Sequence, residues 1–162
     1  MKALFGFLAV SFVYFTAMAT PGVVADVSLT PVGDFKAHMD DVKGFATQEG
    51  DTFKAENIVV DLKSMKTGLP LRDKHAKEKY LEVEKYPTAT LVKAIGKAGK
   101  GRARIRLKNI EKDVDGTYKI EGGELKADFP IKLSDYKITG IKYMGVGVDD
   151  KVDVHVTVPI KK

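Results

Sequence analysis

Three polar residues close together in the chain, Arg72, Asp73 and His75, could recognise a ligand. One interpretation is a polar cluster at the mouth of a cavity, where a guanidinium and an imidazole fix the head group of a bound molecule. The other interpretation, which we favour, is structural. In it, Asp73 stabilises the first turn of a helix, and Arg72 pairs with a carboxylate or donates to loop carbonyls.

The residue types that perform covalent or metal chemistry are absent or poorly spaced. The chain has no Cys, which excludes thiolate catalysis, disulfides and thiolate metal sites. No serine lies in a Gly-x-Ser-x-Gly setting, and no two of His38, His75 and His155 are two or four positions apart. We therefore expect a protein that is not an enzyme and that holds neither a metal ion nor a cofactor.

A basic stripe, Arg102, Arg104, Arg106 and Lys108, alternates with apolar residues and shares one face of an expected strand. The interpretation we favour is an ordinary solvated outer face. The sharper alternative is weak contact with an anionic membrane surface or an acidic partner. Basic and acidic residues are interspersed along the chain, and the net charge of +5 selects no partner by itself.

Period-two alternation is the dominant pattern and predicts strands with one apolar and one polar face. It runs through residues 102–108, 125–133 and 152–160. Such strands are typical of antiparallel sheets, because parallel strands buried on both faces read as continuous apolar runs. Asp115-Gly116 and Gly122-Gly123 are expected to supply the positive φ of tight hairpins. The second half of the chain is therefore predicted to be an antiparallel meander.

One segment, residues 72–83, has helical periodicity, with Ala76, Tyr80 and Val83 on one face. We expect this helix to pack its narrow apolar face on one side or one end of the sheet. A single helix cannot cover a sheet of roughly eight to ten strands, so the sheet must close into a barrel or fold into a sandwich. The periodicity leaves both architectures open.

The apolar faces of the predicted strands are the main candidate site. In a sandwich they would form a filled core, whereas in a barrel of about eight strands they could line a tunnel for one small ligand. Burial of an apolar ligand contributes about 0.8 kcal/mol per methylene, so binding would need no polar motif. The expected lining residues are Ile105, Leu107, Leu125, Phe129, Ile131, Val154 and Val156.

The first 25 residues resemble a secretory signal peptide. Lys2 gives a positive start, an apolar run follows, and Val23 and Ala25 stand where signal peptidase needs small or branched residues. We expect cleavage after Ala25, which leaves one domain, residues 26–162, exported across the inner membrane to the periplasm. An uncleaved membrane anchor is the alternative. Nucleic acid is not an expected partner of an exported chain.

Two further stretches are informative together. Thr67-Gly68-Leu69-Pro70-Leu71-Arg72-Asp73-Lys74-His75 opens the expected helix, and Lys85-Tyr86-Pro87 leads into the next strand. They resemble the corresponding motifs of the bacterial YceI-like family, whose members are secreted lipocalin-like barrels that bind polyisoprenoids. The resemblance implies an all-β fold, an antiparallel lipocalin-like β-barrel with one short α-helix.

The resemblance also implies a function. It is that of a periplasmic carrier that sequesters a long apolar lipid, a polyisoprenoid or prenyl quinone, in the barrel tunnel. Arg72 and His75 would then lie at the polar end of the ligand. The alternative is a secreted barrel with a filled core that acts through its surface as an interaction or stress-response module. The pattern predicts no oligomeric state.

Overall fold

The computed structural model describes residues 20–143 and 145–161, which form strands and a few short helical elements. The strands are β1 (Gly22–Thr30), β2 (Asp34–Met39), β3 (Val42–Lys43), β4 (Ala46–Glu49), β5 (Thr52–Asp61), β6 (Thr88–Lys97), β7 (Lys100–Leu107), β8 (Ile110–Glu121), β9 (Glu124–Lys132), β10 (Lys142–Tyr143) and β11 (Val146–Lys161). The helical elements are the 3-10 turns η1 (Leu62–Ser64) and η3 (Leu133–Tyr136), the α-helix α1 (Pro70–His75) and the π-helical turn η2 (Ala76–Tyr80).

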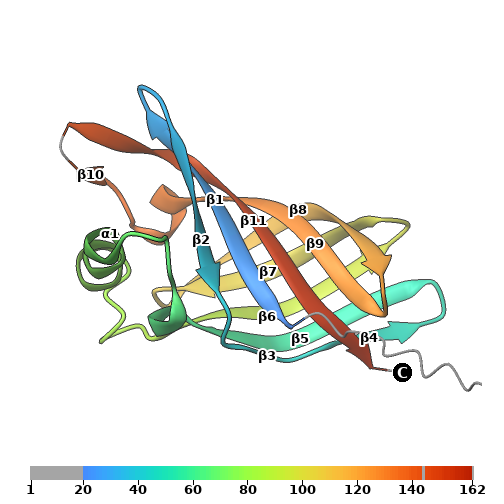
Figure 1. Cartoon of the computed structure of the whole chain (residues 1–162). Coiled ribbons are helices and arrows are strands. Elements are labelled where there is room, and N and C mark those ends of the chain that lie inside the picture. Colours follow the sequence, from blue (N-terminus) through green and yellow to red (C-terminus); the bar gives the residue numbers. More distant parts are fainter. Residues whose placement is uncertain (1–19, 144, 162) are drawn as a thin grey trace, which may run out of the picture.

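The described strands form a closed barrel, as the family resemblance implies (Figure 1). Hydrogen bonds link β4 through β5, β6, β7, β8 and β9 to β11, and a short parallel pair between β11 and β4 closes this ring of 7 strands. That parallel pair, Ile160–Lys161 beside Ala46–Thr47, is the exception in an otherwise antiparallel set of described pairs. β1 and β2 extend the wall, since β1 pairs with β11, and β2 is bridged to Lys66 through His38.

The predicted meander is confirmed, because β6, β7, β8 and β9 pair in sequence order. One predicted turn is wrong: Asp115-Gly116 lies inside the continuous strand β8. The hairpin before β8 turns instead at Lys108 and Asn109, with φ values of 49° and 61°, as a two-residue turn of this hand requires. Gly116 serves close approach, since a Cβ there would lie 2.4 Å from the carbonyl oxygen of Asp128.

The predicted helix exists with different bounds. It begins at Pro70, where the missing N–H of proline costs nothing, and it continues as a π-helical turn to Tyr80. Its apolar face is the predicted one, with Ala76 and Tyr80 turned to the barrel interior and Val83 buried beyond it. Lys108 ties its end to the barrel, since its Nζ donates to the carbonyl of Tyr80 at 3.1 Å and pairs with Glu82 at 2.5 Å. Within the described chain, none of the helices has the length and apolarity needed to cross a bilayer.

The proposed processing site after Ala25 falls within β1. Residues 1–19 of the expected signal peptide lie outside the described residues, but Gly22 to Ala25 pair with β11, and Val23 to Ala25 also pair with β2. Val23 is buried, and Ala25 packs against the same core. A chain that began at Asp26 would lose this half of β1 from the wall.

Candidate ligand cavity

The helix α1 lies at one end of the barrel (Figure 1), and a cavity extends toward this end. A cavity of about 490 Å³ lies between the inward faces of β1, β2, β5, β6, β7, β9 and β11. Its lining is mostly aliphatic and aromatic, and the polar exceptions are Thr67, Arg72, His75, Tyr80, Thr90 and Lys142. Because the lining residues His75 and Lys142 are exposed, the cavity reaches the surface here, and we call this end the mouth.

Most of the residues singled out from the sequence meet in this cavity. The lining includes Ile105, Leu107, Phe129, Ile131, Val154 and Val156, as well as Arg72 and His75. Leu125 is elsewhere. It lines a separate cavity of about 70 Å³ nearer the opposite end of the barrel. The structure therefore brings eight of the nine candidate residues to one space, which favours a binding cavity over a filled core.

The contribution of β1 and β2 to the cavity wall was not predicted from the sequence. Val23, Ala25 and Val27 of β1 line the cavity, and so do Phe35, Ala37 and Met39 of β2. Both sets alternate with polar or outward-facing residues, so the period-two signal was present. In β1 it was obscured because the same residues complete the apolar run that was assigned to the signal peptide.

A compact hydrogen-bond network fixes the segment that leads into α1. Asp73 Oδ1 accepts from the backbone N–H of Thr67 at 2.8 Å and from its hydroxyl at 2.5 Å. Arg72 donates from Nε to Thr67 Oγ1 at 2.9 Å and from a terminal nitrogen to the Thr67 carbonyl at 2.8 Å. Thr67 itself is buried. Arg72 therefore donates to a loop carbonyl, as the structural interpretation expects, whereas Asp73 binds the loop before the helix and does not cap the first turn.

Arg72 also belongs to the cavity wall. Its guanidinium carbon lies 4.0 Å from the centroid of the Phe35 ring, a cation–π distance, and both residues line the cavity. Thr67 accepts hydrogen bonds from two of the five N–H groups of the Arg72 guanidinium. The guanidinium is therefore held in place and still has N–H groups that can donate to a ligand. At the mouth, such a cation can donate to a hydroxyl, carbonyl or phosphate oxygen at the polar end of an apolar ligand.

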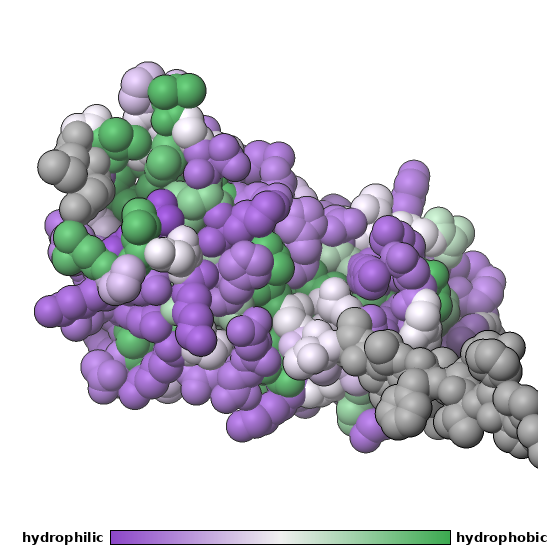
Figure 2. Space-filling view, viewed as in Figure 1, coloured by the Kyte–Doolittle hydropathy of each residue, from purple (hydrophilic) through white to green (hydrophobic). Residues whose placement is uncertain are grey.

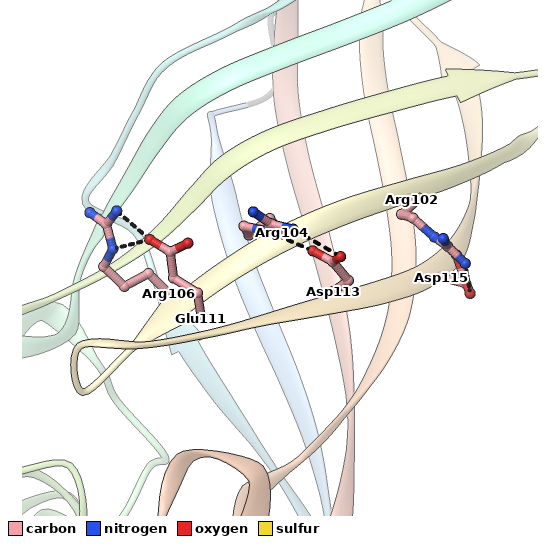
Figure 3. A network of polar contacts seen from close by, with 6 residues as sticks. All are labelled: Arg102, Arg104, Arg106, Glu111, Asp113 and Asp115. Carbon is pink, nitrogen blue, oxygen red and sulfur yellow. Dashed lines mark hydrogen bonds and ion pairs between the residues drawn. The ribbon is translucent and has the colours of Figure 1, made fainter.

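The basic stripe is neutralised by the neighbouring strand (Figure 3). Arg102 forms a two-bond pair with Asp115 at 2.7 and 3.0 Å, and Arg104 does the same with Asp113 at 2.7 and 3.1 Å. Arg106 pairs with Glu111. These pairs hold the pKa values of Asp113 and Asp115 below their usual range, chiefly through the arginine hydrogen bonds. The basic stripe is therefore a solvated outer face whose arginines are paired with acidic residues. It does not present the unpaired cations that an anionic surface would attract.

The described residues contain no group of three potential ligands arranged to hold a metal ion. His155 comes nearest to a chemical cluster, on the outer face of β11. Its Nδ1 lies 2.5 Å from Asp128 and its Nε2 3.2 Å from Asp26. The hydrogen bond to Asp128 is the largest cause that raises the pKa of His155, and the bond to Asp26 adds to it. This cluster is an ion-pair link across β9, β11 and β1, outside the cavity.

A family model described as the YceI-like domain matches residues 11–160. The comparison with curated proteins gave no match. Among solved structures, BcnA of Burkholderia cenocepacia is 16% identical with a TM-score of 0.63, over 85% of this chain and 94% of that chain. A polyisoprenoid binding domain from Saccharophagus degradans, implicated in plant cell wall breakdown, is 13% identical with a TM-score of 0.56, over 85% and 91%. The YceI protein of Campylobacter jejuni is 19% identical with a TM-score of 0.57, over 100% of both chains. At these identities the likeness concerns the fold.

Proposed function

Because the chain belongs to the YceI-like family, we propose that it is a carrier that holds an isoprenoid lipid inside its barrel. The observation that carries the proposal is the cavity of about 490 Å³, since a barrel that acted only through its surface would fill this space with side chains. A polyisoprenoid-binding neighbour with the same fold supports the ligand class. The cavity also counts against the alternative of an interaction module with a filled core.

Binding in this proposal is a partition into apolar surroundings. Each methylene that leaves water contributes about 0.8 kcal/mol, and a preformed wall of strands avoids the cost of ordering the site. No covalent step is required. Arg72 and His75 would orient the ligand by meeting its oxygen-bearing end at the mouth.

The proposal includes weak contact with an anionic membrane surface, from which such a lipid would have to be taken. We assign this contact to the mouth, because the arginines of the basic stripe are already paired with acidic residues. Figure 2 shows apolar side chains gathered over α1 and the β1–β2 hairpin, and Val32, Leu69 and Leu71 are 81%, 56% and 52% exposed. The adjoining cations Lys74 and Lys142 are also exposed. Apolar side chains that enter the headgroup region beside lysines are typical of peripheral membrane contact.

We also propose that the protein lies in the periplasm, because the chain starts with a positively charged residue followed by an apolar run. Cell fractionation with an antibody against the chain tests this part. Recovery with the cytoplasmic fraction would contradict it.

The decisive experiment measures lipid binding directly. Native mass spectrometry of the purified protein with farnesol and geranylgeraniol should give one-to-one complexes. Leu107→Lys should abolish them, because an ammonium in the apolar cavity must stay solvated or lose its proton. Arg104→Ala, on the outer face, should leave them intact. Circular dichroism shows whether each variant is folded. If the folded wild-type protein binds no prenyl lipid at saturating concentration, the proposal is wrong.

A further inference from the structure

The barrel interior is divided into two cavities in series. The main cavity and the cavity of about 70 Å³ share three lining residues, Leu91, Phe129 and Val156, which we call the floor. The strands that line both cavities, β5, β6, β7, β9 and β11, show the same order. On β7, Ile105 and Leu107 line the main cavity and Ala103 the second. The floor therefore lies at one level of the barrel and separates the space near the mouth from the space beyond.

Phe129 has the largest side chain of the floor, and it is buried. Its backbone is held closely on β9, because Gly116 of β8 approaches so near that a Cβ there would lie 2.8 Å from the Phe129 Cβ. On its other side Phe129 is in register with Val154 of β11. The backbone of Phe129 is thus held from both neighbouring strands, which places its ring at the level of the floor.

The second cavity has its own aromatic wall. Phe53 and Tyr118 line it and meet edge to face, with their ring centroids 5.4 Å apart. Tyr118 packs over Gly96, where a Cβ would lie 2.5 Å from its ring. Packed rings therefore leave little free volume at this end, and a ligand that stops at the floor does not occupy it.

The geometry points to Phe129 as the residue that sets how long a lipid chain the barrel accepts. This inference rests on the proposed function and specifies its substrate class: a short isoprenoid whose apolar end stops against the floor. At about 30 Å³ per methylene-sized group, close to the share of a water molecule in the liquid, the main cavity holds roughly 16 carbons, or about three isoprene units. Longer chains would protrude from the mouth.

Removal of the Phe129 ring should join the two cavities. The ring supplies six carbon positions, and the second cavity adds roughly two more by the same measure. Phe129→Ala should therefore extend the accepted chain by about eight carbons, between one and two isoprene units. Leu125→Ala is the matched control, because Leu125 lines the second cavity alone. It enlarges the space behind an intact floor, and the accepted length should stay at that of the wild type.

The experiment uses linear prenols from 10 to about 40 carbons, each measured by native mass spectrometry and by displacement of a fluorescent fatty-acid probe. The expected result is a wild-type affinity that rises with chain length and levels off near three units, a plateau one to two units later in Phe129→Ala, and no change in Leu125→Ala. Circular dichroism and thermal melts identify a variant that does not fold. Leu91→Ala, which opens the floor from β6, then replaces Phe129→Ala, and the same later plateau is expected.

The outcomes separate this inference from the proposed function. If the wild-type protein binds no prenol, the proposed function fails and the inference falls with it. If it binds prenols but the folded floor variant levels off at the same length, the carrier function stands and the role of Phe129 is refuted. An equal shift in Leu125→Ala also refutes it, because the floor would then not be the barrier.

Discussion

Asp73 should be among the most costly polar residues to remove, although it lies at the surface end of the barrel. Its Oδ1 accepts both the N–H and the hydroxyl of Thr67, at 2.8 and 2.5 Å, and Thr67 is only 9% exposed. In Asp73→Ala, both Thr67 donors lose a charged acceptor in a site that water reaches poorly. The Thr67 hydroxyl, which also accepts from Arg72, loses its orientation as well.

The magnitude follows from these contacts. A hydrogen bond to a charged group contributes about 1.5–3 kcal/mol, and the partial exposure of Asp73 reduces the sum of two such bonds to about 3 kcal/mol. In a chain of this size that loss lowers the melting temperature by about 6–12 °C. Asp73→Asn keeps one acceptor oxygen and should lose about half as much.

Urea unfolding followed by far-UV circular dichroism measures the loss. Glu78→Ala is the control, because Glu78 is an exposed carboxylate of η2, and its removal should change the unfolding free energy by less than about 0.5 kcal/mol. Should Asp73→Ala prove as mild as Glu78→Ala, the network around Thr67 does not hold the segment, and Arg72 would need another explanation for its position in the cavity wall.

Three further predictions concern other parts of the chain. N-terminal sequencing of the exported protein should begin at Thr20, because Ala17-Met18-Ala19 offers the small-x-small pattern of a cleavage site and leaves β1 whole, and a start at Asp26 would contradict this. Tyr136 is 1% exposed, its hydroxyl has no hydrogen-bond partner among the described residues, and burial raises its pKa to about 12. Tyr136→Phe should therefore be neutral or stabilise by up to about 1 kcal/mol in urea unfolding, whereas a clear loss would mean that the hydroxyl is paired. Because the folded state raises the pKa of His155, its ion pairs should stabilise the protein fully below the unfolded value of 6.5 and fade as the pH rises through the folded value. The stability difference between wild type and His155→Gln should thus shrink from pH 5.5 to pH 9, and a constant difference would refute the assignment.

The barrel walls were predictable because their alternation is regular and each strand buries one face. The pairing of the basic stripe with acidic residues of β8 was also encoded in the sequence. A two-residue turn at Lys108 and Asn109 fixes the register of β7 against β8, and that register places an acid opposite each of Arg102, Arg104 and Arg106. Because the turn was predicted at Asp115-Gly116 instead, this pairing was not predicted.

The position of the floor was not predictable. Leu125 and Phe129 lie on the same face of one strand. Alternation cannot reveal that Phe129 belongs to a layer of side chains from β6, β9 and β11 that separates Leu125 from the main cavity. That layer depends on how far each strand is staggered around the barrel, which only the closed structure fixes. The change of phase in β5 can, in contrast, be read from the sequence. Ala55 and Ile58 are an odd number of positions apart, and Asn57, with a φ of 51°, lies between them.

The pairing of β1 with β11 has a consequence for how the chain acquires its structure. The two strands come from opposite ends of the sequence, and their side chains meet in the contact between His155 and Asp26, 129 residues apart. Contacts over such separations carry a large loop-closure cost and slow the approach to the native state. β11 is the partner of β1, as well as of β9 and β4, so the barrel cannot close until β11 has been synthesised. An incomplete chain would expose the open edges of β1 and β9 and their apolar faces, which makes it a natural client for chaperones and proteases.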